Sequence, residues 1–417
     1  MRIKTILNRI QKHPGFVYSG IMVVETNRGL AIQVAIRPRK GSKPVCSGCQ
    51  KRGAGYDTTS SRRFEFVPLW GIRVFFHYAM RRVACPRCGV KVEAVPWAQG
   101  KCRLTHVYTW FLARWAKRLS WSETAEVFQT SWDTVFRSVS MAVSWGRAHL
   151  QLDHVTAIGV DEILWKRGHR YLTVVYQIDA HCKRLLWVGP DRKVKTLLAF
   201  FHWFGAWRSA RLRFVCSDMW RPYLRTIAKK ASQALHVLDR FHIVANMNKA
   251  LDRVRASEAR QLKADGHSPV LKGARWCLLK RPSNRTAHQD FKLAELLKYN
   301  LKTVRAYLLK EDFAFFWNYL SPFWAGRFLD NWCARAMRSK IDPMKKMAAT
   351  LRKHRPLLLN WFRAKKTISA GAVEGFNNKA KLTFRRAYGF KSLVAVEIAL
   401  YHSLGALPEL KMTHRFC

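Results

Sequence analysis

Three carboxylate residues stand where this sequence is otherwise suited to strands or a helix start. Asp161 lies within the apolar segment 155–164, Asp218 ends the apolar segment 212–218, and Glu374 opens a polar stretch near the C-terminus. Carboxylate oxygens are preferred ligands of Mg²⁺ and Mn²⁺. If the three acids meet, their repulsion requires a cation. Two ions about 3.5–4 Å apart suit in-line displacement at phosphorus, one activating a water or a 3′-hydroxyl and the other stabilising the leaving oxygen.

The segments that carry these acids predict an α/β fold. Five segments have the composition and pattern of strands: 155–164, 170–179, 184–188, 212–218 and 234–238. The first three are separated only by short turns, whereas helical segments follow the third, fourth and fifth. This order is the outline of a ribonuclease-H-like core, and it puts Asp161 and Asp218 on neighbouring strands.

Four cysteines form two C-x-x-C pairs, Cys46 with Cys49 and Cys85 with Cys88. Four thiolates suit a closed tetrahedral zinc site with a structural role. The gap of 35 residues, from 50 to 84, is longer than in common zinc ribbons. The alternatives are four unlinked buried cysteines or a redox pair, but nothing marks either pair as the start of a thioredoxin-like helix. We expect Zn²⁺ and a reducing compartment.

Residues 104–149 predict a helix-turn-helix. Helical patterns cover 107–118, 122–128 and 133–139, and 129–132 form a turn between the second and third. In a DNA-binding helix-turn-helix the second helix of the pair enters a major groove. Small helical bundles share the outline, so the prediction depends on the neighbouring cysteine pairs and on the charge.

The charge indicates a polyanionic partner. Lys and Arg number 75 against 26 Asp and Glu, a net charge of +49. Nucleic acid is the expected partner, with affinity that falls steeply with salt. A ribosome-associated or membrane-surface protein is the alternative. The N-terminus lacks a secretory pattern, and the apolar stretch 197–207 is too short to span a bilayer. We expect a cytoplasmic protein.

Residues 258–368 predict a helical block inserted into the α/β core. Its tryptophans stand among basic residues, and we expect core packing for most of them and base stacking for one or two. They are Trp276, Trp317, Trp324, Trp332 and Trp361.

A polar helix face follows the block. Glu374, Asn377, Asn378 and Lys381 recur at helical spacing and share one face. The basic pair Arg385 and Arg386 comes next. A final amphipathic helix over 393–404 is expected to cover the sheet.

These motifs together resemble the DDE transposases of the ISL-three insertion-sequence family. The matching segments are the cysteine pairs, Gly159–Glu162, Ser217–Tyr223 with Trp220 and Arg221, Asp239–His242 with Asn246 and Asp252, and Glu374–Asn378. The resemblance covers nearly the whole chain, in order. It implies that Asp161, Asp218 and Glu374 are the catalytic, Mg²⁺-binding triad. It also implies that the N-terminal modules bind terminal inverted repeats and that the protein acts on the nucleoid of a bacterium. Asp239 and His242 resemble an accessory motif.

The sequence thus predicts five regions. They are a zinc-binding domain (1–103), a helix-turn-helix domain (104–150), the first part of the catalytic core (151–257), the helical insertion (258–368) and the C-terminal part of the core (369–417). The expected partners are double-stranded DNA with inverted repeats, target DNA and further copies of the chain. Another ribonuclease-H-like nuclease, such as a junction resolvase, and a non-enzymatic DNA-binding regulator are the competing hypotheses.

Overall fold

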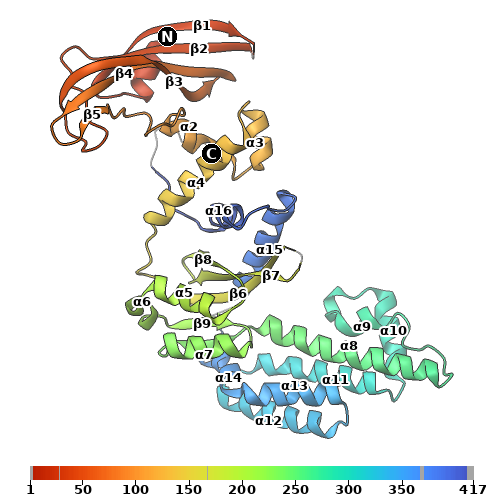
Figure 1. Ribbon diagram of the computed structural model, residues 1–417. Coiled ribbons are helices and arrows are strands. Elements are labelled where there is room, and N and C mark those ends of the chain that lie inside the picture. The colour runs from red at the N-terminus through yellow and green to blue at the C-terminus, as the bar shows by residue number, and fades with distance from the viewer. Residues whose placement is uncertain (1–2, 28, 167, 367–370, 411–417) are drawn as a thin grey trace. The chain divides into compact units, whose positions relative to one another are not determined.

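The computed structural model describes residues 3–27, 29–166, 168–366 and 371–410 (Figure 1). The chain divides into two compact units. The first contains the residues up to Leu150 together with 394–403 and the segment from Leu407, and the second contains 151–393 with 404–406. Among the helices in the described ranges, none is long and apolar enough to cross a membrane.

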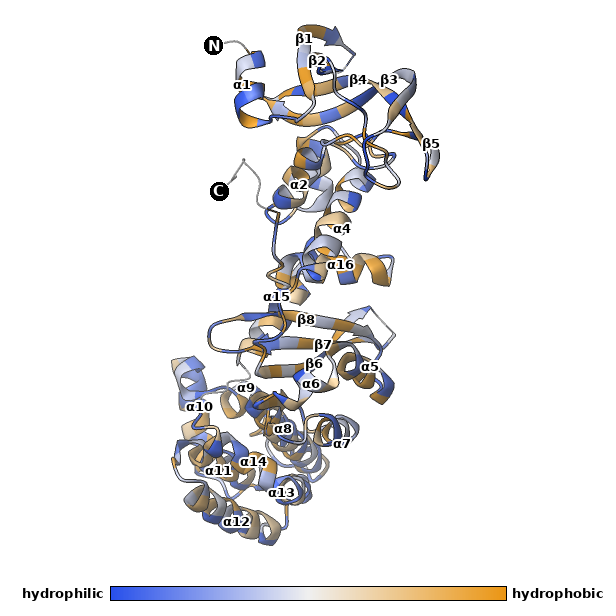
Figure 2. Cartoon of the chain, turned by 90° about the vertical axis from the view of Figure 1, so that its left-hand side faces the viewer, coloured by the Kyte–Doolittle hydropathy of each residue, from blue (hydrophilic) through white to orange (hydrophobic). Residues whose placement is uncertain are grey.

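A five-stranded sheet forms the first part of the N-terminal unit. It follows helix α1 (Ile3–Ile10) and consists of β1 (Phe16–Thr26), β2 (Gly29–Pro38), β3 (Ala54–Leu69), β4 (Ile72–Cys85) and β5 (Gly89–Val92). The strand order is β1-β2-β4-β3, with β5 also paired to β4. Figure 2 shows the hydropathy of these strands, and residues two apart are buried together: Phe64 and Phe66 on β3, and Val74 and Phe76 on β4. Short apolar runs at 21–24, 30–36, 64–67 and 72–78 favour strands that fall within β1, β2, β3 and β4, whereas the sequence predicts neither α1 nor β5.

Three helices complete this part of the unit. They are α2 (His106–Trp115), α3 (Trp121–Val127) and α4 (Trp132–Ala148). Each helix follows a capping residue whose side-chain hydroxyl oxygen accepts a backbone N–H from the first turn. These capping residues are Thr105, Ser120 and Ser131. Ser120 and Glu123 form a reciprocal capping box. The predicted succession of three helices is confirmed.

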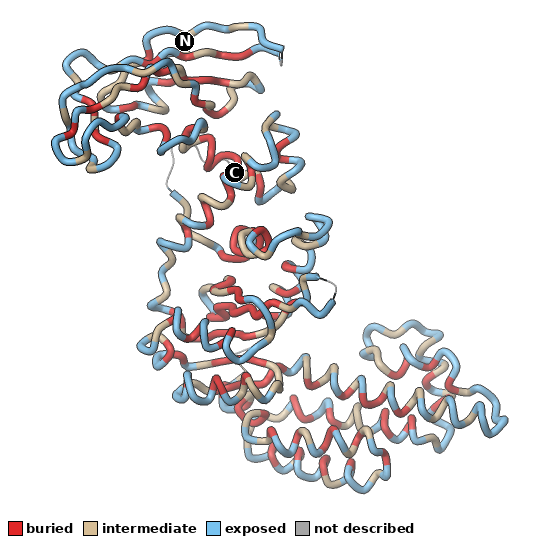
Figure 3. Tube along the Cα trace, in the orientation of Figure 1, coloured by how far each residue is buried: buried red, intermediate tan, exposed pale blue. Residues whose placement is uncertain are grey.

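The second unit is built on a mixed five-stranded sheet. Its strands are β6 (Ala157–Lys166), β7 (Arg170–Ile178), β8 (Lys183–Pro190), β9 (Phe214–Ser217) and β10 (Leu235–Leu238), in the order β10-β9-β6-β7-β8. The first three run antiparallel through short turns, whereas β9 and β10 lie parallel to β6 and to each other. Figure 3 shows the interior of this sheet as buried chain. All five predicted strands are present.

Helices cover both faces of this sheet. Between β8 and β10 the chain forms α5 (Val194–Phe204), α6 (Ala206–Ala210) and α7 (Arg221–Lys230). Phe200 of α5 and Ile227 of α7 pack on Ile158 and Val160 of β6. On the other face, α15 (Gly371–Arg386) contacts β6 and β7.

A helical block lies between β10 and α15. Its elements are α8 (Arg240–Ala264), α9 (Arg275–Leu279), η1 (Pro282–Asn284), α10 (Ala287–Leu297), α11 (Lys302–Ala314), η2 (Phe315–Asn318), α12 (Pro322–Arg338), α13 (Asp342–Lys353) and α14 (Arg355–Arg363). They enclose a core of their own around Leu329 and Trp332. Asn360 of α14 donates to the His236 carbonyl of β10 at 2.7 Å, which ties the block to the sheet. The predicted boundary at 368 lies outside the described residues.

The last helix, α16 (Leu393–Leu404), has the predicted bounds. The sequence predicts that this helix covers the second sheet as part of region 369–417, whereas residues 394–403 group with the N-terminal unit. Apolar residues lie on most sides of α16, and such a pattern does not specify which partner covers the helix.

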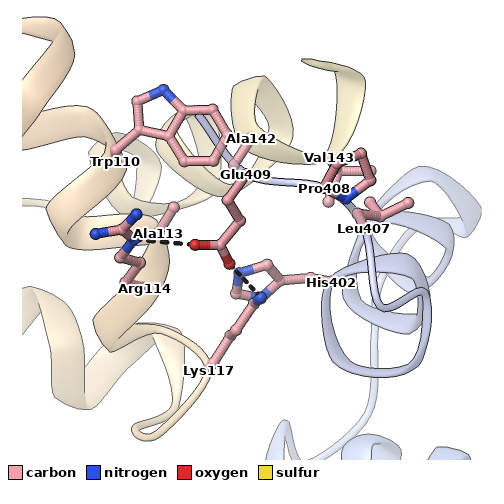
Figure 4. Close-up of a pocket in the computed structure, with 10 residues that line it drawn as sticks. All are labelled: Trp110, Ala113, Arg114, Lys117, Ala142, Val143, His402, Leu407, Pro408 and Glu409. Carbon is pink, nitrogen blue, oxygen red and sulfur yellow. Dashed lines mark hydrogen bonds and ion pairs between the residues drawn. The ribbon is translucent and has the colours of Figure 1, made fainter. Parts of the chain in front are cut away.

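Specific contacts hold the C-terminal segment on α2 and α4. Arg147 of α4 forms an ion pair with Glu397 at 2.8 Å. A side chain at Gly146 would meet Leu407, because a Cβ there would stand 2.7 Å from the Leu407 Cβ. Beyond it, the Glu409 carboxylate pairs with Arg114 at 3.0 Å and Lys117 at 2.6 Å (Figure 4).

Candidate active site

Three aspartates stand in one row across the parallel part of the second sheet. Gly159 of β6 pairs with Cys216 of β9, so Asp161 and Asp218, two positions further on each strand, are level. Leu238 of β10 pairs with Ser217, which makes Asp239 level with Asp218. Parallel strands lie about 4.8 Å apart, so the register brings the three backbones to one edge of the sheet.

Helix α15 brings Glu374 toward this row. Val373, its neighbour, packs on β6, where a Cβ at Gly159 would stand 2.4 Å from the Val373 side chain. Only a glycine therefore leaves room for the helix at that point. The negative charge of Glu374 acts on Asp239, and the Glu374 side chain itself is exposed.

Asn377 links α15 to the strand that carries Asp161. Its amide nitrogen donates to Oδ2 of Asp161 at 2.5 Å, and its amide oxygen accepts the Tyr176 hydroxyl at 2.9 Å. The Tyr176 ring is fully buried and stacks on Phe376, with ring centroids 4.9 Å apart. These contacts leave the Asp161 carboxylate little freedom to turn.

His242 lies between two of the aspartates. Its Nε2 is 3.7 Å from Oδ1 of Asp161 and 3.7 Å from Oδ2 of Asp239. The polar contact with Asp161, followed by the nearby negative charges, raises the pKa of His242 to about 9. Asp239 also caps helix α8 by accepting the Phe241 N–H at 2.8 Å. Of the accessory motif suggested by the sequence, Asp239 is therefore part of the row and His242 lies beside it.

Arg192 is a second cation at this end of β6. The Arg192 guanidinium is 2.7 Å from Glu162 and 3.6 Å from Asp218, and it lies over the Trp220 ring at 4.7 Å. The backbone N–H of Trp220 donates to Asp218 at 2.9 Å. Asp218 is thus held from one side by a backbone donor and approached from the other by a guanidinium.

Five acidic side chains and two cations share this end of the sheet. In chain order they are Asp161, Glu162, Arg192, Asp218, Asp239, His242 and Glu374. Burial raises the pKa of Glu162 to about 7 and that of Asp239 to about 6, and neighbouring carboxylates add to both shifts. The carboxylates outnumber the cations, and they repel one another when all are charged. Such a group of oxygen donors fits Mg²⁺ or Mn²⁺.

The three predicted ligands are not drawn tightly together. Among the described residues, only the four cysteines form a group whose ligand atoms all lie within 4.8 Å of one another. The Cys49 and Cys85 sulfurs are 3.5 Å apart, close to the roughly 3.8 Å edge of a tetrahedron with Zn–S bonds of about 2.3 Å. Gly48 sits in the first turn, where a Cβ would stand 3.0 Å from the Cys88 sulfur. The cluster therefore fits zinc.

The remaining predicted site residues lie on exposed surface. They are Arg221 at the start of α7 and, along α15, Asn378, Lys381, Arg385 and Arg386. No site role was predicted for Tyr176, Arg192 or Glu162. Glu162 carries a signal, because strand alternation puts it on the apolar face with Val160. Tyr176 and Arg192 carry none, since their roles depend on contacts that span the fold.

The comparisons with known proteins bear on the same segment. The ISL-three (ISL3) family model, described as "Transposase", matches residues 158–399, more than half of the chain. The chain belongs to the ISL-three family of DDE transposases. The family inferred from the motifs is therefore confirmed.

Two relatives extend the match over almost the whole transposase. The transposase for insertion sequence element IS1001 of Bordetella parapertussis is 29% identical over 366 residues, which cover 87% of this chain and 89% of the relative. The transposase for IS1557 of Mycobacterium tuberculosis (strain H37Rv) is 30% identical over 413 residues, which cover 93% of this chain and 91% of the relative. The N-terminal unit is thus shared as well as the second sheet.

Proposed function

We propose that this transposase binds the terminal inverted repeats of an insertion sequence and then cleaves and joins DNA strands by a DDE mechanism. Asp161, Asp218 and Glu374 are the metal-binding carboxylates of this proposal. The row that Asp161 and Asp218 form across β6 and β9 is the observation that carries it, together with the packing of α15 on β6. The strand order agrees with a ribonuclease-H-like core.

The residues around the row have defined tasks in this mechanism. Asn377 and Tyr176 fix the orientation of Asp161, and the Trp220 N–H does so for Asp218. His242 and Arg192 partly balance the charge of the carboxylates. Mg²⁺ or Mn²⁺, when bound by the three acids, supplies activation of the attacking hydroxyl and stabilisation of the leaving oxygen.

The N-terminal unit supplies DNA recognition in the same proposal. Helices α3 and α4 form a helix-turn-helix whose second helix has a length suited to a major groove. Zn²⁺ at the four cysteines holds the turns near β4 and β5. A net charge of +49 provides phosphate affinity for both the inverted repeats and the target DNA. We further propose that several copies assemble on DNA at the nucleoid.

Strand cleavage of a supercoiled plasmid that carries the inverted repeats tests this proposal. With Mg²⁺ present, the wild-type protein should cut at the element ends and join the cut ends to a target. Asp218→Asn and Glu374→Gln should bind the same DNA but cut it at least about a thousandfold more slowly, because each removes a ligand charge needed in the transition state. Asp153→Asn is the matched control, since Asp153 is exposed and pairs only with Arg208 outside the row.

Each competing hypothesis predicts a different pattern in this assay. Cutting without joining would identify a simple nuclease. Binding without cutting by any variant, the wild type included, would identify a regulator. Unchanged cutting by Asp218→Asn would show that the triad is wrongly assigned.

A further inference from the structure

The tryptophans of the helical block fall into two groups. Trp317 and Trp332 are buried, and Trp361 is partly buried. Trp276 and Trp324 are each 54% exposed, and each has an arginine guanidinium over its ring. Core packing thus accounts for the first group and leaves the second unexplained.

Trp324 alone of these two lies in a groove. The groove has a volume of about 630 Å³ and runs along α12, lined by Trp324, Arg327, Asn331, Arg335 and Arg338 among others. We call it the α12 groove. These five positions recur every three or four residues, so they form one face of the helix.

The opposite face of α12 fills the core of the block. Ala325, Leu329, Trp332 and Ala336 are completely buried there. The groove face is therefore not a core surface that packing has left incomplete. It is a separate, solvent-facing surface with an aromatic ring at one end and guanidinium groups along its length.

The charge of the groove is positive. Arg335 pairs with Asp312, whereas the structure gives no carboxylate partner within 4.0 Å for Arg327 or Arg338 in the described part of the chain. Arg327 lies 5.6 Å from the Trp324 ring centroid, and Arg338 donates only to the Ala334 carbonyl at 3.4 Å. A ligand with repeated negative charges complements this arrangement.

The dimensions suit a short nucleic-acid strand. Arg327 and Arg338 are eleven positions apart on one helix, which corresponds to about 16 Å. Phosphates of a stacked strand recur about every 3.4 Å, so the groove spans about five nucleotides. The exposed Trp324 ring adds a stacking surface, which only an unpaired base can occupy, because bases in a duplex are already stacked on each other.

We propose that the α12 groove binds an unpaired DNA strand, with a base stacked on Trp324 and phosphates at Arg327 and Arg338. This inference rests on the proposed function, because strand cleavage creates free strand ends, and the bases at a free end can unpair from their complement. The groove gives the helical block a role in holding such a stretch.

Equilibrium binding of the full chain to two fluorescent probes tests the proposal, in buffer without Mg²⁺ or Mn²⁺ so that no cleavage occurs, and without chelator so that the cysteine cluster keeps its zinc. The probes are a ten-nucleotide oligothymidylate and a blunt ten-base-pair duplex. Trp324→Ala should weaken oligothymidylate binding about ten- to hundredfold and leave duplex binding unchanged. Trp276→Ala is the matched control, because Trp276 has the same exposure and an equivalent arginine contact but lies outside the groove.

The arginines provide a second, independent measurement. Arg338→Ala should reduce the dependence of oligothymidylate binding on salt, by about 0.7 in the logarithmic slope for one lost phosphate contact. Equal losses from Trp324→Ala and Trp276→Ala, or no loss from Trp324→Ala, would overturn the proposal. If Trp324→Ala weakens the binding of oligothymidylate and duplex equally, the proposal is also overturned, and the groove is instead a duplex-binding surface.

Failure of the proposed function is distinguishable from failure of this inference. Asp218→Asn should bind the oligothymidylate as the wild type does, since the groove does not include the carboxylates. If the wild type cuts no DNA but Trp324→Ala still selectively loses the unpaired strand, the groove assignment stands and the DDE assignment falls. If the wild type cuts DNA normally and Trp324→Ala shows no selective loss of the unpaired strand, the DDE assignment stands and the groove assignment falls.

Discussion

Asn377 illustrates at the residue scale how one side chain joins distant parts of the sequence. It stands more than two hundred positions from Asp161 and three from Glu374, and it donates directly to Asp161. Helical spacing predicted a shared face for Glu374 and Asn377, but the structure buries Asn377 and exposes Glu374. The Asn377 amide therefore orients the Asp161 carboxylate, whereas the Glu374 side chain is exposed.

His402 provides a pH-dependent prediction at the same scale. It is buried on α16 beside the Lys117–Glu409 ion pair (Figure 4), and burial lowers its pKa to about 4, with the Lys117 charge adding to the shift. The unfolded chain binds a proton near pH 6.5, so stability is lost as pH falls from about 7 toward 4. His402→Gln should remove about 2 kcal/mol of the stability difference between pH 7.5 and pH 5.

The free energy of unfolding in urea is measured for both proteins at pH 7.5 and pH 5. Hydrogen exchange in α2 reports separately on local stability near His402. The comparison is between the pH dependences of the two proteins, not between their stabilities at one pH. Identical pH dependences for the wild type and His402→Gln would mean that His402 titrates alike in the folded and unfolded chains.

At the element scale, local patterns predicted which elements form but not what covers them. The five strands of the second sheet follow from apolar runs and their turns, and the capping residues Ser120 and Ser131 mark helix starts. The neighbouring positions of Asp161 and Asp218 also follow, since one acid lies within the first strand of the sheet and the other directly follows the fourth. The Gly159–Val373 contact does not, because it depends on the approach of a helix from far along the chain.

The cysteine turns give the element-scale prediction. The backbone N–H groups of Arg87 and Cys88 lower the pKa of Cys85, which favours the thiolate that zinc requires, whereas burial and the neighbouring cysteines raise the pKa of Cys88. We expect one zinc per chain in protein purified without chelator. Cys85→Ser should lose the metal and destabilise the sheet that contains β4 and β5 by several kcal/mol, because zinc binding contributes directly to folding.

Metal analysis and limited proteolysis of residues 1–103 measure the zinc effect. Cys102→Ser is the control, because Cys102 is exposed and stands outside the cluster. A full metal content in Cys85→Ser, or a zinc-free wild type with the same protease resistance, would contradict the assignment.

At the scale of the whole molecule, the two units do not follow the order of the chain. The N-terminal unit takes its last helix from residues 394–403. Val396 on that helix is fully buried, whereas Val394 is 61% exposed. Val396→Ser should therefore destabilise the N-terminal unit by about 2 kcal/mol, and Val394→Ser should have little effect.

Hydrogen exchange locates the effect of Val396→Ser. Faster exchange is expected in α2–α4, which belong to the same unit as α16. Faster exchange confined to β6–β8 would instead support the placement predicted from the sequence, with α16 on the catalytic sheet.

The position of α16 has a consequence for synthesis on the ribosome. Domains near the N-terminus usually begin to fold while the rest of the chain is still being made, at about 5–20 residues per second. Between Leu150 and Val394 the ribosome adds 243 residues, so the N-terminal unit waits about 10–50 s for its last helix. A nascent or prematurely terminated chain carries an unfinished unit. Only a chain that has been synthesised past α16 can complete it, so folding of the N-terminal unit depends on prior synthesis of the whole segment that forms the second sheet and the helical block.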